Sequence, residues 1–434
     1  MALDRRTLVK YVAGASAAGA FAGCISTEDP GSGDEDGGDG GDGGADEYDR
    51  DDEYEALEPE EGVDGEATLW HDLTESATAL FDGNVDSFNS EYAPTIRADA
   101  VAEFVDATTT SIPAGEGPEL FLWAHDLVGD YQQNGFLSDQ SDEVRVDLDL
   151  FGEAADAAQF DGGLYGLPYA AETVALIYNE DYVDEPPETF EEMREIMEEY
   201  HDPENGVYGL SHNFDAYFYS AWAHCFGGYY FDDETGELGI TNDETIEGLE
   251  FVRDELYPYM PQDWEYETQA AIFVDGNAPF AINGPWFLGD VEDFEASVAP
   301  FPTVDGNEPS PYTGIQLLYF AAAMDDDEDR AAAARSFAEW YATNTSIAAQ
   351  MAAEQGYIPV HEAFVEDDEE ADELPESVQG FTRAVEQGIP MPTDPRMQDV
   401  WEPIETEFEE VLQDNKTVEE AMGDAESQIL DAWD

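Results

Sequence analysis

The chain has 434 residues, and its 105 Asp and Glu against 13 Lys and Arg give a formal net charge of -92. A nucleic-acid binder needs a basic surface to displace counterions from phosphates, so this balance excludes that class, and it equally excludes a protein held on anionic lipid by charge. With 42% hydrophobic and 12% aromatic residues, the composition favours a large folded core, and the length suggests two or three domains.

The acidic charge is spread along the whole chain. Residues 25–65 carry a net charge of -17, and residues 66–434 carry -77. A folded body with that charge density repels itself at low ionic strength, whereas at molar salt the screening length falls to roughly 3 Å. We therefore interpret the charge as adaptation to a molar-salt environment. The functional alternative is the binding of polycations or calcium.

Residues 1–23 predict an export signal that ends before a lipidated cysteine. Arg5 and Arg6 lie in a short polar start, and residues 11–23 are apolar and small but too few to span a bilayer. Small residues directly precede Cys24. This arrangement resembles a twin-arginine lipoprotein signal. The resemblance implies twin-arginine export, cleavage before Cys24, lipidation of its thiol and an anchor on the extracellular face of the cytoplasmic membrane.

Residues 24–65 are rich in Gly, Asp and Glu and show no apolar period, which predicts a disordered acidic tether. If Cys24 is lipidated, Cys225 has no partner for a disulfide, and we expect it to be a small buried hydrophobe. The tether would hold the folded body near the membrane.

Apolar runs and helical patterns alternate from residue 66 onwards. We expect strands at 67–70, 120–123, 174–178 and 279–283, a strand or crossover at 317–324, and helices at 190–200, at 330–351 and after the capping-box pattern of 417–420. Thr189 is the expected N-cap of the helix at 190–200. This alternation predicts an α/β architecture in two lobes.

The sequence contains no convincing catalytic or metal-binding motif. We find no Gly-x-Ser-x-Gly elbow, no phosphate-binding Gly-rich loop and no His-Glu-x-x-His pattern, and the six histidines lack the spacing of metal ligands. A pair of glycosidase carboxylates can be drawn almost anywhere among 105 acids, so such a pair carries little information. We therefore expect no enzymatic activity, no cofactor and no metal.

Several aromatic residues lie beside polar residues and turns, namely Trp70, Trp123, Tyr217, Trp286 and Trp401. Aromatic faces stack on the apolar faces of sugar rings, and neighbouring carboxylates accept hydrogen bonds from sugar hydroxyls. A single such Trp is more often a core residue, but five together favour a sugar-binding cleft. A binder of amino acids would need an Arg for the α-carboxylate, and few basic residues lie near these motifs.

Four ordered blocks resemble the maltose/maltodextrin-binding proteins, the extracytoplasmic receptors of ABC sugar importers. The blocks are 118–135, with Trp-Ala-His-Asp at its centre, 164–179, 280–286 and 391–401, and weaker similarity spans 66–434. The resemblance implies a two-lobed periplasmic-binding-protein-like α/β fold whose discontinuous lobes are joined by a three-segment hinge. The N-terminal lobe would comprise 66–171 plus 317–374, the C-terminal lobe 172–316 plus 375–434, and the crossings would lie near 171–173, 313–317 and 373–376.

The resemblance also implies a role for each residue of the ligand site. Trp123 and Asp126 would hold sugar from the first lobe, and Glu172 would accept hydroxyl hydrogen bonds at the hinge. Asp215 and Tyr217 would act from the second lobe, Trp286 and Trp401 would be stacking platforms, and Trp70 would support the site. The ligand would be maltose or a malto-oligosaccharide, the protein partner an ABC permease, and the chain a monomer.

Two departures from the family pattern leave the sugar and its length open. Leu127 stands where the family often has an Arg, and Thr74-Glu75 stands where it has a Lys, so two cationic donors to sugar hydroxyls are lost. The alternatives are a membrane-tethered enzyme that acts on α-glucans, and a receptor of the same fold for another ligand such as trehalose. Asn344-Thr345-Ser346 and Asn415-Lys416-Thr417 match the glycosylation pattern without showing that either site is used.

Overall fold

The computed structural model describes residues 56–433 except 234, 264 and 365–373. The predicted signal, Cys24 and most of the predicted tether therefore lie outside the described residues. None of the helices described is long and apolar enough to cross a membrane. Two residues of the predicted tether contact the folded body. Leu57 donates its backbone N–H to Thr343 Oγ1 over 2.8 Å. The carbonyl of Glu58 accepts a hydrogen bond from Arg145 Nη2 over 3.1 Å. The tether prediction is thus wrong for these two residues, which are held against the folded body.

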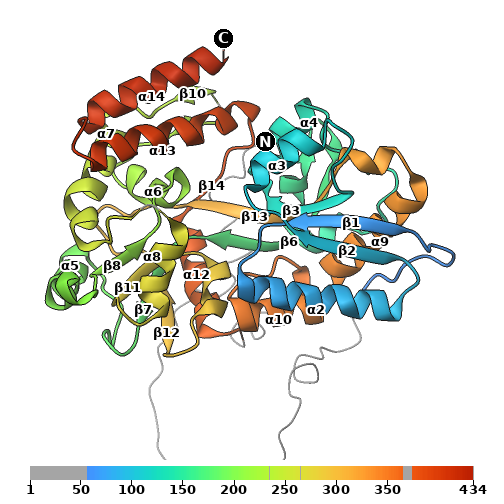
Figure 1. Ribbon diagram of the computed structural model, residues 1–434, viewed down its shortest axis with the longest axis horizontal. Helices are drawn as coiled ribbons and strands as arrows, with labels where there is room; N and C mark the ends of the chain where they lie inside the picture. The colour runs from blue at the N-terminus through green and yellow to red at the C-terminus, as the bar shows by residue number, and fades with distance from the viewer. Residues whose placement is uncertain (1–55, 234, 264, 365–373, 434) are drawn as a thin grey trace, which may run out of the picture.

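Two β-sheets form the centres of two lobes (Figure 1). The larger sheet has the strand order β14-β13-β3-β1-β2, with β6 also paired to β13, and the smaller has the order β12-β7-β11-β8. The strands are β1 (Glu66–His71), β2 (Thr95–Ala100), β3 (Leu120–Ala124), β4 (Gln159–Phe160), β5 (Gly163–Leu164), β6 (Gly166–Thr173), β7 (Ala175–Asn179), β8 (Leu210–His212), β9 (Phe231–Asp232), β10 (Glu237–Leu238), β11 (Phe280–Asn283), β12 (Ala296–Ala299), β13 (Tyr312–Phe320) and β14 (Ile389–Pro390).

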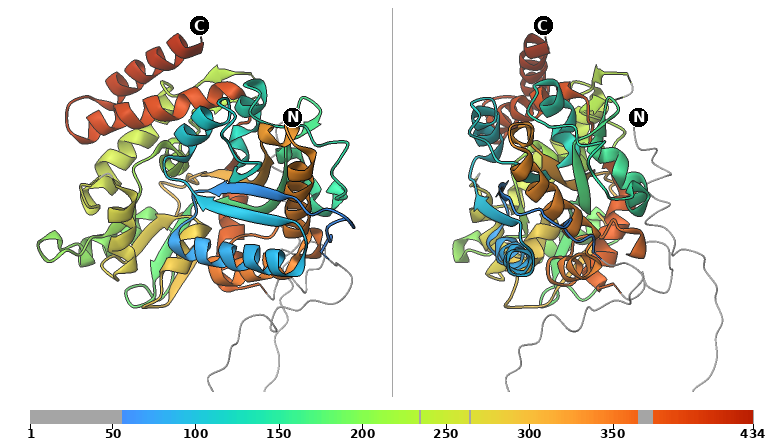
Figure 2. Two further views of the ribbon diagram at one scale, coloured as in Figure 1. Left: turned by 45° about the vertical axis from the view of Figure 1, so that its right-hand side comes forward. Right: turned by 90° about the vertical axis from the view of Figure 1, so that its right-hand side faces the viewer.

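Helices cover both sheets and form the two ends of the molecule (Figure 2). The α-helices are α2 (Glu75–Glu91), α3 (Phe104–Ser111), α4 (Val128–Gln133), α5 (Phe190–Tyr200), α6 (Ala216–Ala223), α7 (Asp243–Phe251), α8 (Tyr266–Val274), α9 (Glu328–Thr343), α10 (Thr345–Gln355), α12 (Glu376–Gln387), α13 (Gln398–Leu412) and α14 (Val418–Trp433). Short helical turns are η1 (His125–Leu127), η2 (Leu148–Ala158), η3 (Pro203–Asn205), η4 (Val252–Leu256), η5 (Tyr257–Tyr259), η6 (Pro285–Asp290), η7 (Ala322–Asp325), η8 (Glu362–Phe364) and η9 (Pro395–Met397).

The parallel strands of the larger sheet direct their carboxyl ends toward one edge. β1 pairs in parallel with both β2 and β3, and β13 pairs antiparallel with β3 and β6. In sheets of this kind ligands bind outside the carboxyl ends of the strands. β1 ends at His71 and β3 at Ala124, so the segments that start at Asp72 and His125 leave the sheet at the same edge.

The two sheets are joined through neighbouring segments of chain. β6 belongs to the larger sheet and β7 to the smaller one, and only Val174 separates them. β12 and β13 make the same change of sheet in the reverse direction, and α12 packs against both β12 and β6. The arrangement is the two-lobed α/β fold that the sequence predicts. The lobe boundaries at 171/172, 316/317 and 374/375 stay a prediction.

Local sequence signals account for most of the element boundaries. Helix α5 occupies 190–200 as expected, because Thr189 forms a capping box in which its hydroxyl accepts from Glu192 N while the Glu192 carboxylate accepts from Thr189 N. The same reciprocal bonds between Thr417 and Glu420 open α14. The strands expected at 67–70, 120–123, 174–178 and 279–283 correspond to β1, β3, β7 and β11.

The single helix predicted at 330–351 is wrong, because the chain forms two helices there. α9 ends at Thr343 and α10 begins at Thr345. Asn344 between them has extended backbone angles, and its side chain accepts hydrogen bonds from Ser346 N and Ile347 N. Asn caps helix N-termini through such bonds, so the side chain that resembles a glycosylation acceptor instead starts a new helix.

Candidate functional site

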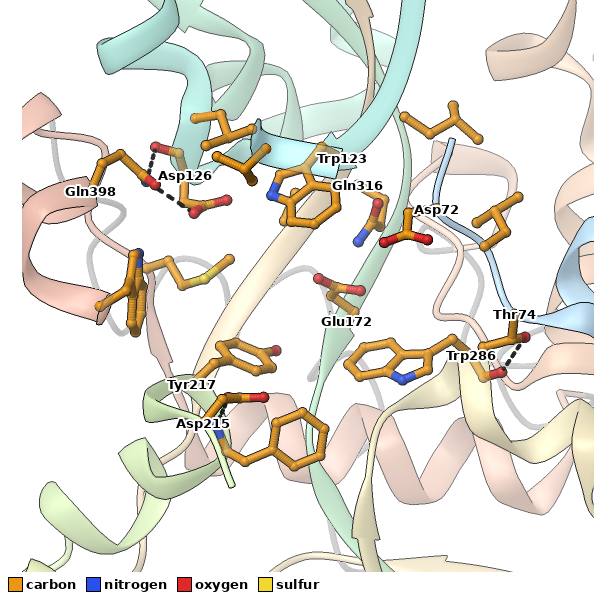
Figure 3. A pocket seen from close by; sticks show the side chains of 18 of the residues that line it. Asp72, Thr74, Trp123, Asp126, Glu172, Asp215, Tyr217, Trp286, Gln316 and Gln398 are labelled. Atoms are coloured by element: carbon orange, nitrogen blue, oxygen red, sulfur yellow. Dashed lines mark hydrogen bonds between the residues drawn. The ribbon is translucent and has the colours of Figure 1, made fainter. Parts of the chain in front are cut away.

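A cavity of about 490 Å³ lies between the two lobes (Figure 3). Its lining comes from the segment after β1, from β3 and η1, from β6 and β13, from the start of α6, from η6 and from α13. Of the eight predicted site residues, seven line it: Trp123, Asp126, Glu172, Asp215, Tyr217, Trp286 and Trp401. Their direct role in ligand binding stays a prediction.

Trp123 and Asp126 enter the cavity from the carboxyl end of β3. Trp123 stacks on the buried Phe104 with ring centroids 4.9 Å apart and planes at 6°, so this contact fixes the orientation of the indole. η1 then places Asp126 in the lining, and its side chain is only 7% exposed. The core residue Phe104 thus determines which way a potential stacking surface faces.

Asp126 is held from the opposite lobe by Gln398, the first residue of α13. Gln398 Nε2 donates to Asp126 Oδ2 over 3.0 Å and to the Asp126 carbonyl over 3.1 Å, as the dashed lines in Figure 3 mark. The other carboxylate oxygen, Oδ1, is buried and has no hydrogen-bond partner. Burial raises the pKa of Asp126 to about 6, and the bond from Gln398 acts in the opposite direction.

Glu172 lies on β6 near the crossing between the lobes and is 4% exposed. Its Oε2 atom is buried without a hydrogen-bond partner. Burial raises the pKa of Glu172 to about 7, although a hydrogen bond from Gln316 lowers it. Gln316 is itself held by Tyr169, whose hydroxyl donates to Gln316 Oε1 over 3.2 Å. The Glu172 carboxylate is therefore held in place and has one oxygen, Oε2, that can accept a further hydrogen bond.

Two carboxyl groups occupy the N-terminus of α6. Asp215 caps the helix by accepting from Phe218 N over 3.0 Å, and Glu405 of α13 accepts from Ala216 N over 3.3 Å. Burial raises the pKa of both groups, and the charge of Asp215 raises that of Glu405 further. The cap also presents Tyr217, whose buried hydroxyl has no hydrogen-bond partner.

Trp286 and Trp401 supply aromatic surface from the second lobe. The Trp286 ring lies directly over Gly284, where a Cβ would come within 2.2 Å of the indole, so this Gly-Pro-Trp turn requires glycine for close approach. Trp286 Nε1 donates to the Tyr266 hydroxyl over 3.2 Å. Trp401 meets Tyr312 edge to face, with centroids 5.7 Å apart. Each ring is therefore fixed by the residues that surround it.

The two lobes also touch directly at both sides of the cavity. Thr74 Oγ1 donates to the Trp286 carbonyl over 3.2 Å, opposite the contact between Gln398 and Asp126. Beside that contact, Gly129 of α4 packs so closely on the chain before η9 that a Cβ would lie 2.1 Å from the Thr393 carbonyl oxygen. These contacts are made between protein groups alone and close the cavity at opposite edges.

Trp70 does not line the cavity, unlike the other predicted site residues. It is the last residue but one of β1, is paired with Asp99 of β2 and Phe121 of β3, and packs partly buried against the core. Its neighbour Asp72, just beyond the end of β1, is a lining residue instead. Support of the site by Trp70 through the sheet stays a prediction.

Lining residues that the sequence reasoning missed include Gln316, Tyr357, Gln398 and Glu405. Gln398 and Glu405 lie three residues before and four after Trp401 on α13. Residues at this spacing share one face of a helix, so this periodicity could have revealed both. Gln316 and Tyr357 carry no comparable local signal, because folding alone brings them to the cavity.

Among the described residues, no group of three or more His, Cys, Asp or Glu is arranged to hold a metal ion. His125 is buried, its pKa is lowered to about 4 by burial, and its Nδ1 accepts from Ile315 N over 3.1 Å. It therefore holds β13 to η1. Cys225 is a buried free thiol, as expected.

Comparisons with known proteins identify close relatives. Residues 84–377 match the family of bacterial extracellular solute-binding proteins. A maltotriose-binding protein of Pyrococcus abyssi is 38% identical over 362 residues, which cover 81% of this chain and 78% of that protein. A maltodextrin-binding protein of Bacillus subtilis is 25% identical over 382 residues, 83% of this chain and 89% of the relative.

A solved structure has the same fold. The maltotriose-binding protein of Thermus thermophilus, bound with maltotriose, superposes with a TM-score of 0.76 and is 28% identical. The match covers 85% of this chain and 100% of the Thermus chain. The similarity therefore extends over most of this chain and the whole of the Thermus chain.

Proposed function

This chain belongs to the family of bacterial extracellular solute-binding proteins, and from that premise we propose that it captures malto-oligosaccharides between its lobes for an ABC importer. The observation that carries the proposal is the lining of the cavity. Indole and phenol rings lie beside two buried acceptor atoms without partners, Asp126 Oδ1 and Glu172 Oε2. A sugar ring offers an apolar face to the aromatic rings and hydroxyl donors to the two acceptor atoms.

The mechanism is a shift of population from open to closed lobes. Ligand that contacts Asp126 from the first lobe and Trp286 or Trp401 from the second binds the closed form better than the open one. The hinge would consist of the crossings near 171–173, 313–317 and 373–376, with the lobe boundaries given above. The closed form would dock on the permease as a monomer, and the chain would perform no chemistry and need no cofactor.

The proposal also specifies where the mature protein is located. The twin-arginine pattern would direct export, and a lipid on Cys24 would anchor the protein to the outer face of the cytoplasmic membrane. Mass spectrometry of the membrane-fraction protein tests this anchor: the mature chain is expected to begin at Cys24 and to carry a lipid on that thiol, and Cys24→Ala to carry none. A mature wild-type chain without lipid on Cys24 would contradict the lipid anchor.

Calorimetry in molar KCl tests the ligand directly. Maltotriose is expected to bind, and Trp286→Ala or Trp401→Ala to weaken binding by at least about 1 kcal/mol, since aromatic contacts carry energies of that order. Trehalose in the same panel tests the alternative receptor, and incubation with maltoheptaose tests the alternative enzyme. Unchanged affinity in both variants would refute the site, and shorter glucans would refute a purely binding role.

A further inference from the structure

Among the residues described, the lining of the cavity contains acidic side chains and no basic ones. Five acids line it, namely Asp72, Asp126, Glu172, Asp215 and Glu405, and the described lining contains no Lys, Arg or His. The ion pairs among the described residues use other acids throughout. The Lys and Arg residues that the structure describes thus all lie outside the cavity lining.

Three oxygen atoms of this lining lack a hydrogen-bond donor. They are Asp126 Oδ1, Glu172 Oε2 and Tyr217 Oη, and all three are buried. In Figure 3 the Tyr217 hydroxyl and the Glu172 carboxylate point toward the same central space, and the free oxygen of Asp126 points away from Gln398. A buried acceptor without a donor is costly, so the two carboxylate oxygens favour a ligand rich in donors, whereas the Tyr217 hydroxyl can either accept or donate.

An amino group satisfies this arrangement better than a hydroxyl does. A hydroxyl brings one donor and no charge, whereas a protonated amine brings three donors, no acceptor and a positive charge. Inside a partly dehydrated cavity the attraction between opposite charges is stronger than in water, and so is the repulsion between like charges. A carboxylate on the ligand would meet five acids and no Lys, Arg or His in the described lining, so it would have no cation to accept from.

Resting on the proposed function, we propose that the cleft selects oligosaccharides by charge. It binds a malto-oligosaccharide that carries a protonated amino group more tightly than the neutral parent, and it rejects the anionic analogue. Asp126 and Glu172 are the residues that distinguish the three ligands.

The electrostatics of the two carboxyl groups agree with this assignment. Burial raises the pKa of both Asp126 and Glu172, because their charged forms lose water without gaining a cation. A ligand ammonium would supply that cation. The described residues offer no metal-binding group that could take the same place.

The experiment uses matched maltotriose derivatives and the full-length protein. In each derivative one C6 hydroxyl is replaced by an amino group or oxidised to a carboxylate, at each of the three rings in turn. Affinities are measured by calorimetry at neutral pH in molar KCl, where the screening length of roughly 3 Å removes attraction by the distant acidic surface. We expect at least one amino derivative to bind about tenfold tighter than maltotriose, and every carboxylate derivative about a hundredfold weaker.

Two variants locate the effect in the cleft. Glu172→Gln and Asp126→Asn keep the size of the side chain but remove its charge, and each is expected to reduce the preference for the amino derivative about tenfold. Glu185→Gln is the control, because Glu185 is exposed and does not line the cavity, so the preference should not change. Circular dichroism confirms that each variant is folded.

The outcomes separate this inference from the proposed function. If maltotriose binds and no amino derivative binds more tightly, charge selection is refuted while the receptor role stands. Carboxylate derivatives that bind as well as maltotriose would refute it too. If no ligand of the series binds the folded wild-type protein, the proposed function fails and this inference fails with it. The wild-type comparison decides the matter even if both cleft variants unfold.

Discussion

Replacing Gln398 with Met should weaken ligand binding although Gln398 need not touch the ligand. Its amide donates to both Asp126 Oδ2 and the Asp126 carbonyl, and it does so from the opposite lobe. If the lobes open as proposed, both acceptors would reach water in the open form, so these two bonds would stabilise the closed form selectively. Met has nearly the same length and bulk as Gln but has no donor, so the substitution removes the bonds with little change in packing.

The size of the effect follows from the two bonds. A hydrogen bond to a charged acceptor contributes about 1.5–3 kcal/mol and one to a neutral acceptor about 0.5–1.5 kcal/mol. The lower ends of both ranges add to about 2 kcal/mol, which corresponds to about a thirtyfold loss of affinity, since 1.4 kcal/mol is tenfold. We use the lower ends because water can replace part of each bond.

The pH dependence distinguishes this role from simple packing. Burial raises the pKa of Asp126 to about 6 while Gln398 lowers it. If the ionised form binds ligand, affinity is full above that pKa and is lost as the pH falls through it. Removal of Gln398 raises the pKa, so in Gln398→Met the loss begins at a higher pH. Gln398→Glu places a second carboxyl group beside Asp126, so repulsion between the two charges at neutral pH should lower the affinity below that of Gln398→Met.

Calorimetric titration with maltotriose from pH 5 to 8 in molar KCl measures both effects. Gln413→Met is the matched control, because Gln413 ends the same helix, is exposed and bonds only to neighbouring side chains. A Gln398→Met protein that binds within twofold of wild type, with an unshifted pH profile, would show that the contact between the lobes does not stabilise the ligand-bound form.

Three further predictions concern the fold. Gly284→Ala should displace the Trp286 ring and weaken maltotriose binding at least about tenfold. Gly423→Ala is the control and should leave the affinity unchanged, because a Cβ at Gly423 meets nothing within 4 Å. Equal affinities of the two variants for maltotriose would contradict the need for glycine at position 284. Asn344→Ala removes the cap of α10 and should lower the free energy of unfolding by about 1 kcal/mol in denaturant titrations, and a change below a few tenths would refute that role. Dialysis into dilute buffer should unfold the protein through repulsion within the acidic body, as circular dichroism would show; a fold retained at low salt would contradict the salt-adaptation account.

Local signals in the sequence were sufficient to predict a helix where a single capping motif determines its start. The capping box at Thr189 and Glu192 is enough to start α5, because both bonds lie within one turn. At Asn344 two local signals compete, since the alanine-rich sequence favours one continuous helix while the Asn side chain caps a new one. The cap prevails in the structure, and helix propensity alone gives no means to anticipate it.

Four aromatic residues of the cavity were predicted from the sequence, whereas Tyr357 and several polar residues were not. Trp286 and Trp401 lie in motifs whose turns are visible in the sequence. Gln398 shares a helix face with Trp401, but its contact with Asp126 joins residues 272 positions apart, which no local pattern indicates. Glu405 is one of 105 acids, so its residue type carried no information until α13 placed it on the face of Trp401. Trp70 was grouped with the site because it precedes polar residues and because of the family resemblance, but it is not among the residues that line the cavity.

The most direct test of the account is the affinity of the full-length protein for maltotriose, measured by calorimetry in molar KCl alongside the variant Trp286→Ala. The account predicts saturable binding of one maltotriose per chain and an affinity loss of at least about 1 kcal/mol in the variant, because that ring lines the cavity. A folded wild-type protein that binds no malto-oligosaccharide, or a variant that binds as tightly as wild type, would contradict it.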